Sequence, residues 1–402
     1  MQRGPQRPTL SRRRLGALAL GAGALGLTGC GAQATSRLGA QNTAAAPAPA
    51  GAAPAAGALG ANFNGAPEMV TFDELRATGT DWLRGFHTMH DDPGKGAVPL
   101  LRTASERGYR TALSLKFQYH DKDLPRPGTP EMDAELRRVD PVLDAAQSWL
   151  DVLAVGNEPF LETKPGQQDQ RLNEFYEAVA RHVIDRLGPQ RRTRLYMGAL
   201  NHLEKAEDRT PATARWVEFA ARTPELDGVD IHPHVADPAD VGVYVDYVLS
   251  RLRPDQSFLV TEFSLVLLWQ DRLKEPISDR YAAASGLQRG TPVWRAIRQA
   301  IEHPVPQEQW NLLLSTSPWY ENHKHFLREQ VQRFRGTGRL ALASYGLAHD
   351  DAMIDNFGLG KPPWLLNSLF ASRTVQPAPN GLPGQGYAWL DDFRALQQNP
   401  PR

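Results

Sequence analysis

The chain has 402 residues, of which 41% are hydrophobic, so it can bury a large core in one large barrel or in two ordinary domains. Its 45 Lys and Arg residues balance its 45 Asp and Glu residues, giving a formal net charge of zero. This balance removes any general electrostatic case for binding nucleic acid or anionic lipid, so we expect no nucleic-acid partner.

Residues 1–30 are predicted to be an export signal rather than part of the fold. Three consecutive arginines follow Ser11, and an apolar run then extends from Leu15 to Leu27, which is shorter than the about 20 residues that span a bilayer. The Ser-Arg-Arg pattern resembles a twin-arginine signal. The run ends in Leu-Thr-Gly-Cys, which resembles a bacterial lipoprotein processing site with Cys30 as the lipidated residue. A plain signal peptide with an incidental cysteine is the alternative.

Residues 31–60 are rich in Ala, Pro and Gly and contain few large apolar side chains. Such a segment cannot bury a face, so we expect a flexible linker. Cys30 is the only cysteine, so no intramolecular disulfide can form. The expected protein is exported across the bacterial inner membrane and held in the cell envelope, in the periplasm or at the cell surface, by a lipid at Cys30.

From residue 61 to residue 395, short β-type runs alternate with longer amphipathic runs. This alternation is typical of a parallel α/β fold, and eight such units predict a single (β/α)₈ TIM barrel. One helix is expected in two pieces, because Pro141 interrupts it. The predicted elements, in chain order, are strand 59–66, helix 69–78, strand 80–89, helix 98–108, strand 109–119, helix 130–149, strand 150–157, helix 170–188, strand 193–200, helix 212–223, strand 226–234, helix 240–253, strand 257–266 and strand 339–347.

The connection between the last two predicted strands is long, from about Leu265 to Gly338. A connection of this length normally contains extra helices or a functional lid. It carries four tryptophans, and one or two of them are expected to line a sugar-binding cleft, because sugars stack on exposed aromatic rings. The four are Trp269, Trp294, Trp310 and Trp319.

Polar residues gather at the predicted carboxyl ends of the strands, where the active site of a TIM barrel lies. Two of them are glutamates that end strongly apolar runs, Glu158 after strand four and Glu262 after strand seven. Strands four and seven face each other across the barrel mouth, and two facing carboxylates are what glycoside hydrolysis requires. The others are Arg84, His87, Tyr119, His120, Asn157, Asn201, His202, His232, His234 and Tyr345.

These motifs resemble those of the clan A glycoside hydrolases, which are retaining enzymes on a (β/α)₈ barrel. That group carries Asn-Glu, often Asn-Glu-Pro, after strand four and a second Glu after strand seven. Asn157-Glu158-Pro159 and Thr261-Glu262-Phe263 match both places. An Arg after strand two and a His after strand six also match, as Arg84 and His232. The resemblance covers residues 61–395 in topology and only these short motifs in sequence.

The resemblance implies a catalytic role for both glutamates, with Glu158 as general acid/base and Glu262 as nucleophile. It also implies that Asn157 hydrogen-bonds the sugar 2-hydroxyl and that Arg84 keeps Glu262 ionised. His232 is placed with the substrate-binding residues by the same resemblance. No cofactor is implied, and a carbohydrate is the expected partner.

Three positions depart from the pattern of the clan. Ser264 stands where many members have Gly, and His234 stands where many have Tyr. After strand eight, where many members have Trp, this chain has Tyr345 and later Trp364. We expect His234, Tyr345 and Trp364 to contact substrate.

Two other functions stay open. An inactive carbohydrate-binding lipoprotein would use the same barrel. A metal-dependent hydrolase could use His232 and His234, because alternating histidines on a strand can chelate Zn²⁺, although no clear third ligand follows from the sequence. Simpler readings also exist: Glu158-Pro159 could be a turn that leaves the sheet, and Arg84 could be a structural ion pair.

Overall fold

The computed structural model describes residues 57–63 and 71–398. Within them, eight parallel strands close into a barrel, because β1 pairs with β2 on one side and with β8 on the other. The predicted (β/α)₈ TIM barrel is therefore confirmed. The strands are β1 Ala58–Asn62, β2 Trp82–Thr88, β3 Arg110–Lys116, β4 Val152–Val155, β5 Arg194–Leu200, β6 Gly228–Ile231, β7 Ser257–Val260 and β8 Leu340–Ala348.

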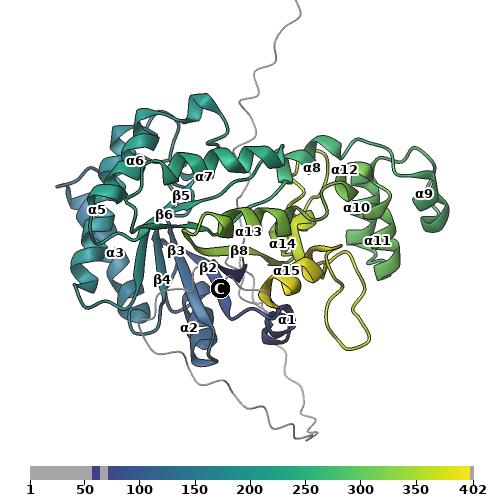
Figure 1. Ribbon diagram of the computed structural model, residues 1–402, viewed down its shortest axis with the longest axis horizontal. Coiled ribbons are helices and arrows are strands. Elements are labelled where there is room, and N and C mark those ends of the chain that lie inside the picture. Colours follow the sequence, from purple (N-terminus) through teal and green to yellow (C-terminus); the bar gives the residue numbers. More distant parts are fainter. Residues whose placement is uncertain (1–56, 64–70, 399–402) are drawn as a thin grey trace, which may run out of the picture. The chain divides into compact units, whose positions relative to one another are not determined.

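Helices surround the barrel, and α3, α5 and α6 lie together at one end of the view in Figure 1. A short ninth strand, β9 (Ser368–Phe370), extends the sheet beside the end of β8. Apart from the helices that precede α13 in the β7–β8 connection, the helices between or after the barrel strands are α1 Phe72–Thr78, α2 Ala97–Glu106, α3 Pro130–Ala146, α4 Pro159–Glu162, α5 Gln170–Leu187, α6 Pro211–Arg222, α7 Val241–Leu249, α13 Phe326–Gly336, α14 Asp351–Ile354 and α15 Trp389–Gln398. Among the described residues, none of the helices has both the length and the apolar character needed to cross a bilayer.

Two predicted boundaries are corrected by the structure. The first strand begins at Ala58, inside the segment 31–60 that was expected to be linker. Helix α3 runs through Pro141 without a break, where two pieces were expected. Val139, Val142 and Leu143 of α3 are buried, so packing of its apolar face outweighs the hydrogen bond lost at the proline. The predicted signal, Cys30 and residues 31–56 of the linker lie outside the described residues.

The barrel interior changes from apolar to polar along the strands. Side chains two residues apart on a strand share a face, so Trp82 and Arg84 on β2 point the same way, as do Ala112 and Ser114 on β3. Trp82 and Ala112 belong to a buried apolar cluster. Arg84 and Ser114, one step further along, are hydrogen-bonded to each other. The polar layer therefore lies toward the carboxyl ends of the strands, where a barrel places its active site.

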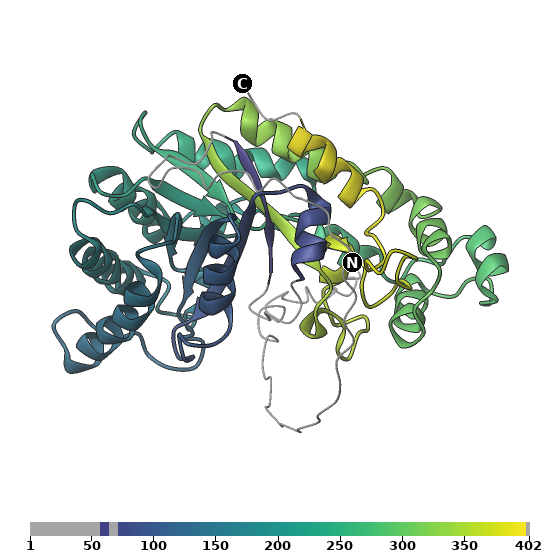
Figure 2. The same cartoon turned by 90° about the horizontal axis from the view of Figure 1, so that it is seen from below.

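The long connection between β7 and β8 is a bundle of short helices. Helices α9, α10 and α11 lie at the end of the barrel away from α3 and α5 in both views (Figures 1 and 2). The helices that precede α13 in this connection are α8 Val266–Arg272, α9 Asp279–Ser285, α10 Val293–Glu302, α11 Gln307–Ser315 and α12 Pro318–Glu321.

The tryptophans of this connection form a core rather than a sugar cleft. Trp269, Trp310 and Trp319 are buried, and Trp269 stacks on Tyr320 with ring centroids 4.8 Å apart. The expectation of an exposed sugar platform is wrong for these three, because extra helices need apolar side chains to pack on one another. Trp294 is half-buried and packs against the same core.

Gly228 at the start of β6 has no room for a side chain. Its φ is +150°, and a Cβ there would lie 1.7 Å from the backbone oxygen of Ser257 on β7. We expect Gly228→Ala to cost at least about 3 kcal/mol of unfolding free energy in denaturant titrations, because the β6–β7 ladder must shift. Gly108→Ala is the matched control: its φ is +88° but nothing lies within 4 Å of the added Cβ. It should cost only about 1 kcal/mol. Equal costs would contradict the proposed backbone clash.

Candidate active site

Arg84 is the centre of the polar layer. Its guanidinium is fully buried and donates from Nη1 to Glu262 Oε1 at 2.6 Å and to Asn62 at 2.9 Å. Nη2 donates to Ser114 at 3.0 Å and to Asn157 Oδ1 at 2.7 Å. One side chain of β2 therefore connects β1, β3 and the loops that follow β4 and β7.

Glu262 is held in its charged form. Burial alone would raise the pKa of its carboxyl, but the positive charges of His232 and Arg84 and a contact with His234 outweigh it. The pKa of Glu262 therefore lies well below its usual range. A carboxylate that is ionised at neutral pH and has a partly exposed side chain is suited to nucleophilic attack.

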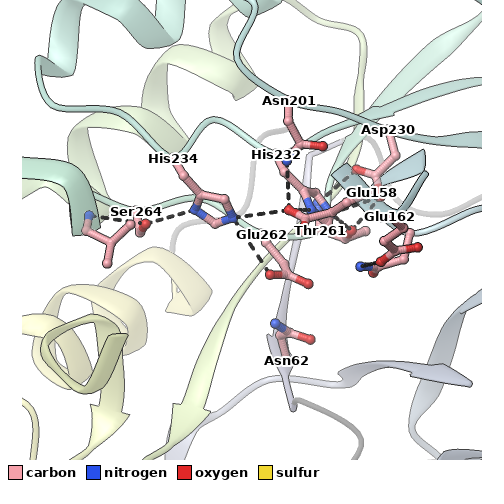
Figure 3. Close-up of polar contacts among 12 residues, drawn as sticks. Asn62, Glu158, Glu162, Asn201, Asp230, His232, His234, Thr261, Glu262 and Ser264 are labelled. Carbon is pink, nitrogen blue, oxygen red and sulfur yellow. Dashed lines mark hydrogen bonds and ion pairs between the residues drawn. The ribbon is translucent and has the colours of Figure 1, made fainter. Parts of the chain in front are cut away.

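Glu158 lies close to Glu262 in the same cluster of polar side chains (Figure 3). Its Oε1 accepts hydrogen bonds from Asn201 Nδ2 at 2.7 Å and from His232 Nδ1 at 3.1 Å. One carboxylate oxygen of Glu158 and one of Glu262 lie within 4.8 Å of each other. The sequence-predicted pair is thus brought together, although β4 and β7 lie far apart along the chain.

A hydrogen-bonded chain leads from the barrel interior to Glu158. The buried Asp230 carboxylate on β6 accepts from the Thr261 hydroxyl and, at 3.0 Å, from the Thr261 amide. Thr261 Oγ1 in turn accepts from His232 Nε2 at 2.8 Å. Both ring nitrogens of His232 are then donors, which is the hydrogen-bonding pattern of a protonated imidazole.

The pKa shifts of His232 and Glu158 agree with a protonated His232. Burial would lower the pKa of His232, but the carboxylates of Glu262, Asp230 and Glu158 raise it to about 10. Burial would raise the pKa of Glu158, but the hydrogen bond and charge of His232 lower it to about 2. In the free protein, the proton shared by this pair therefore resides on His232.

Two of the three positions that depart from the expected motifs, His234 and Ser264, contact each other. His234 Nδ1 lies 2.8 Å from Ser264 Oγ, and the backbones of the two residues form a β-bridge. Trp364 packs edge-on against the His234 ring with centroids 4.8 Å apart. His234 Nε2 lies 3.8 Å from Glu158 Oε1 and 3.8 Å from Glu262 Oε2. His234 therefore lies beside the glutamate pair and Trp364 packs on His234, while their contact with substrate stays a prediction.

Lys116 and Glu162 belong to the same network, and the sequence reading missed them. Glu162 is buried on α4, accepts from Asn157 Nδ2 at 3.0 Å and lies 3.3 Å from Lys116 Nζ. Burial raises the pKa of Glu162 to about 7. Burial would lower the pKa of Lys116, but Glu162, Glu158 and Glu262 raise it. Lys116 ends β3, so listing charged residues at strand ends would have found it.

Three predicted substrate contacts are corrected by burial. Tyr345 is 1% exposed and packs between Phe263 and Trp389, on the outer face of β8, so its predicted contact with substrate is wrong. Arg84 and His232 are both fully buried. They contact the glutamates and can affect a substrate only through them. Asn157 is also buried and is oriented by Arg84 and Glu162.

Comparisons with known proteins place the fold. No protein-family model and no curated protein matches the sequence. Among solved structures, the chain is similar to the GH53 catalytic domain of Ignisphaera aggregans, at 14% identity and a TM-score of 0.50, covering 87% of this chain and 98% of that chain. It is also similar to an endo-1,4-beta-xylanase from Caldicellulosiruptor owensensis, at 11% identity and a TM-score of 0.50, covering 84% and 96%. The chain therefore has the (β/α)₈ fold of these enzymes, with Glu158 and Glu262 opposed at its carboxyl-terminal mouth.

Proposed function

We propose that the protein is a retaining glycoside hydrolase that cleaves a β-linked poly- or oligosaccharide by double displacement. The proposal rests chiefly on the approach of Glu158 and Glu262 to within 4.8 Å. Retaining glycosidases hold their two carboxyl groups about 5–5.5 Å apart, whereas inverting enzymes need about 6.5–9.5 Å to admit a water. The names of the two similar structures, a GH53 catalytic domain and an endo-1,4-beta-xylanase, agree with this reaction class.

In the first step, Glu262 attacks the anomeric carbon while the bond to the leaving-group oxygen breaks. Glu158 takes a proton from His232 Nδ1, which already donates to it, and passes it to that oxygen, so the step leaves Glu158 ionised and His232 neutral. The products are a covalent glycosyl-enzyme ester on Glu262 and a free hydroxyl on the departing sugar. Arg84 lowers the energy of the charged nucleophile before attack.

In the second step, Glu158 removes a proton from a water that attacks the same anomeric carbon. The ester bond to Glu262 breaks, the sugar leaves with its original configuration, and Glu262 is ionised again. Asn157 donates one amide N–H to Glu162, so its second N–H is free to donate to the sugar 2-hydroxyl. Trp364 packs on His234, and we expect it to contact the sugar ring.

The function is tested by incubating the purified protein with a panel of β-glucans, xylans, mannans and galactans. Proton NMR should show that the first-formed reducing end has the β configuration, followed by slow mutarotation. First-formed α product would contradict the retaining mechanism. Sugar binding with no product from any panel member would instead favour the inactive carbohydrate-binding alternative.

The pH dependence of kcat/KM should report the loss of the proton that His232 and Glu158 share. His232 has a pKa of about 10, so it is protonated through neutral pH, and activity should fall only as pH rises toward that value. His232→Gln removes the cation, and burial and the charge of Glu262 then raise the pKa of Glu158. The variant should lose activity at a pH well below 10. A profile unchanged by His232→Gln would exclude His232 as the proton store, and His182→Gln on the surface of α5 is the control.

We also propose that the enzyme is an exported lipoprotein anchored through Cys30. The support is the N-terminal sequence, in which arginines, a short apolar run and Leu-Thr-Gly-Cys follow in order. Labelling bacteria with radioactive palmitate should mark the wild-type chain and leave Cys30→Ser unmarked. A labelled Cys30→Ser protein would contradict the anchor.

A further inference from the structure

His234 brings a metal-ligand atom into the active site. Its side chain is about nine-tenths buried, and its Nε2 has no hydrogen-bond partner in the structure. That atom points toward Glu158 and Glu262 and lies 3.8 Å from one oxygen of each (Figure 3). An unpartnered imidazole nitrogen aimed at two carboxylates is the donor set of a divalent transition cation, particularly Zn²⁺.

The distances suit such an ion after small side-chain movements. Tetrahedral Zn²⁺ with bonds of about 2.0–2.2 Å keeps its ligand atoms about 3.3–3.5 Å apart. The two nitrogen–oxygen separations of 3.8 Å exceed this range by only a few tenths of an ångström. The two glutamates remain within 4.8 Å of each other, so two carboxylates and one imidazole can converge and leave a fourth position for water.

His232 belongs to the same cluster of side chains, but it is not one of the proposed metal ligands. Both of its nitrogens are occupied, Nδ1 by Glu158 and Nε2 by Thr261. Because both nitrogens are engaged in these hydrogen bonds, neither is free to bind a metal. The ligand set is therefore Glu158, His234 and Glu262, contributed by the ends of β4, β6 and β7.

The surroundings of His234 suit both a metal-free and a metal-bound state. Ser264 Oγ accepts from the Val266 amide at 3.3 Å and lies 2.8 Å from His234 Nδ1. In the metal-free protein the hydroxyl can donate to Nδ1, which leaves the proton on Nε2, facing the carboxylates. When Nε2 binds a metal, Nδ1–H can donate to the same oxygen, as metal-bound histidines commonly do. Trp364 holds the ring orientation in both cases.

We propose that Glu158, His234 and Glu262 form a binding site for Zn²⁺ or a similar transition cation that competes with the sugar substrate. The competition part rests on the proposed hydrolase function, because the ion would occupy the nucleophile and the acid/base together. The binding part depends only on the three side chains. The site depends on His234, which supplies the imidazole nitrogen among the three proposed ligands.

Binding is tested by calorimetric titration of ZnCl₂ into untagged, metal-stripped protein, with Co²⁺ absorption as a second probe. We expect one Zn²⁺ per chain and a tetrahedral Co²⁺ spectrum. His234→Gln should weaken binding by more than about 30-fold, and Ser264→Ala by about 10-fold, since it removes only the orienting hydroxyl. His182→Gln, which changes a histidine on α5 paired with Asp140, should bind Zn²⁺ as the wild type does.

Several outcomes would overturn the site. They are no wild-type binding, equal affinity of wild type and His234→Gln, or an equal loss in His182→Gln. Melting curves of the metal-free variants show whether His234→Gln is folded, and Ser264→Ala gives a second, milder test. Inhibition is measured separately as the effect of Zn²⁺ on KM for a cleaved glycan. Binding without any hydrolysis would reject the hydrolase while keeping the site, and hydrolysis without binding would reject the site alone.

Discussion

Replacing Glu262 by glutamine is expected to lower kcat by more than about 10⁴-fold on any glycan that the wild-type protein cleaves. The amide is nearly isosteric, but it cannot form the glycosyl ester on which both steps depend. Its loss also leaves the guanidinium of Arg84 facing a neutral group at the position of its 2.6 Å ion pair. Initial-rate measurements with the responsive glycan test this directly.

External nucleophiles can separate the roles of the two glutamates. With an activated aryl glycoside, azide should restore turnover to Glu262→Gly and give a glycosyl azide of inverted configuration. Azide should rescue Glu158→Gly with retained configuration, because there it attacks the ester formed on Glu262. Glu308→Gln, a change at an exposed position of α11, is the matched control and should leave kcat unchanged. The opposite stereochemistry in the two rescues would exchange the assigned roles.

Arg84→Met is expected to destabilise the fold by about 3–5 kcal/mol and to reduce activity strongly. The substitution keeps an unbranched apolar stem but removes the only cation that contacts Glu262, Asn157, Asn62 and Ser114 together. It leaves the Glu262 carboxylate and three polar groups without this partner. Arg76→Met is the control, because Arg76 forms an exposed ion pair with Asp73 and should contribute less than about 1 kcal/mol.

The stability difference should depend on pH in one direction. Glu262 has a depressed pKa in the folded protein, so its ion pair stabilises the fold above the usual glutamate pKa of 4.5. That stabilisation is lost as the pH falls from 4.5 through the lower folded value. Denaturant titrations should therefore show the largest gap between Arg84→Met and wild type near neutral pH and a smaller gap in acid. A gap that is constant across this range would assign the effect to packing alone.

The fold and the catalytic pair could be predicted because both leave local signals. Each barrel strand is a short apolar run bounded by turn residues, and a parallel barrel brings every carboxyl end of those runs to one rim. Glu158 and Glu262 end two such runs, so their meeting followed from the fold alone. The order of strands and helices along the chain could be predicted from these local signals alone.

The sequence-based predictions failed where the result depends on the direction in which a side chain points or on the residue that it contacts. Ser344 on β8 donates to Thr261 inside the barrel, so its neighbour Tyr345 must point outward into the helical shell, which strand alternation could have shown. The tryptophans of the β7–β8 connection gave no comparable signal, because aromatic residues in a core and in a sugar cleft look alike in sequence. The pairing of His234 with Ser264 depends on register between two loops.

Because Arg84 contacts several separate parts of the barrel, the active site is expected to form together with the rest of the fold during refolding. The positive charge of Arg84 is paired with Glu262 after β7, and its other N–H groups reach their acceptors only when β1, β3 and the end of β4 are also in place. A half-formed barrel would hold that charge away from water without its counter-ion, which is energetically unfavourable. Catalytic competence after refolding should thus return in one cooperative step with ring closure, rather than gradually as separate segments order.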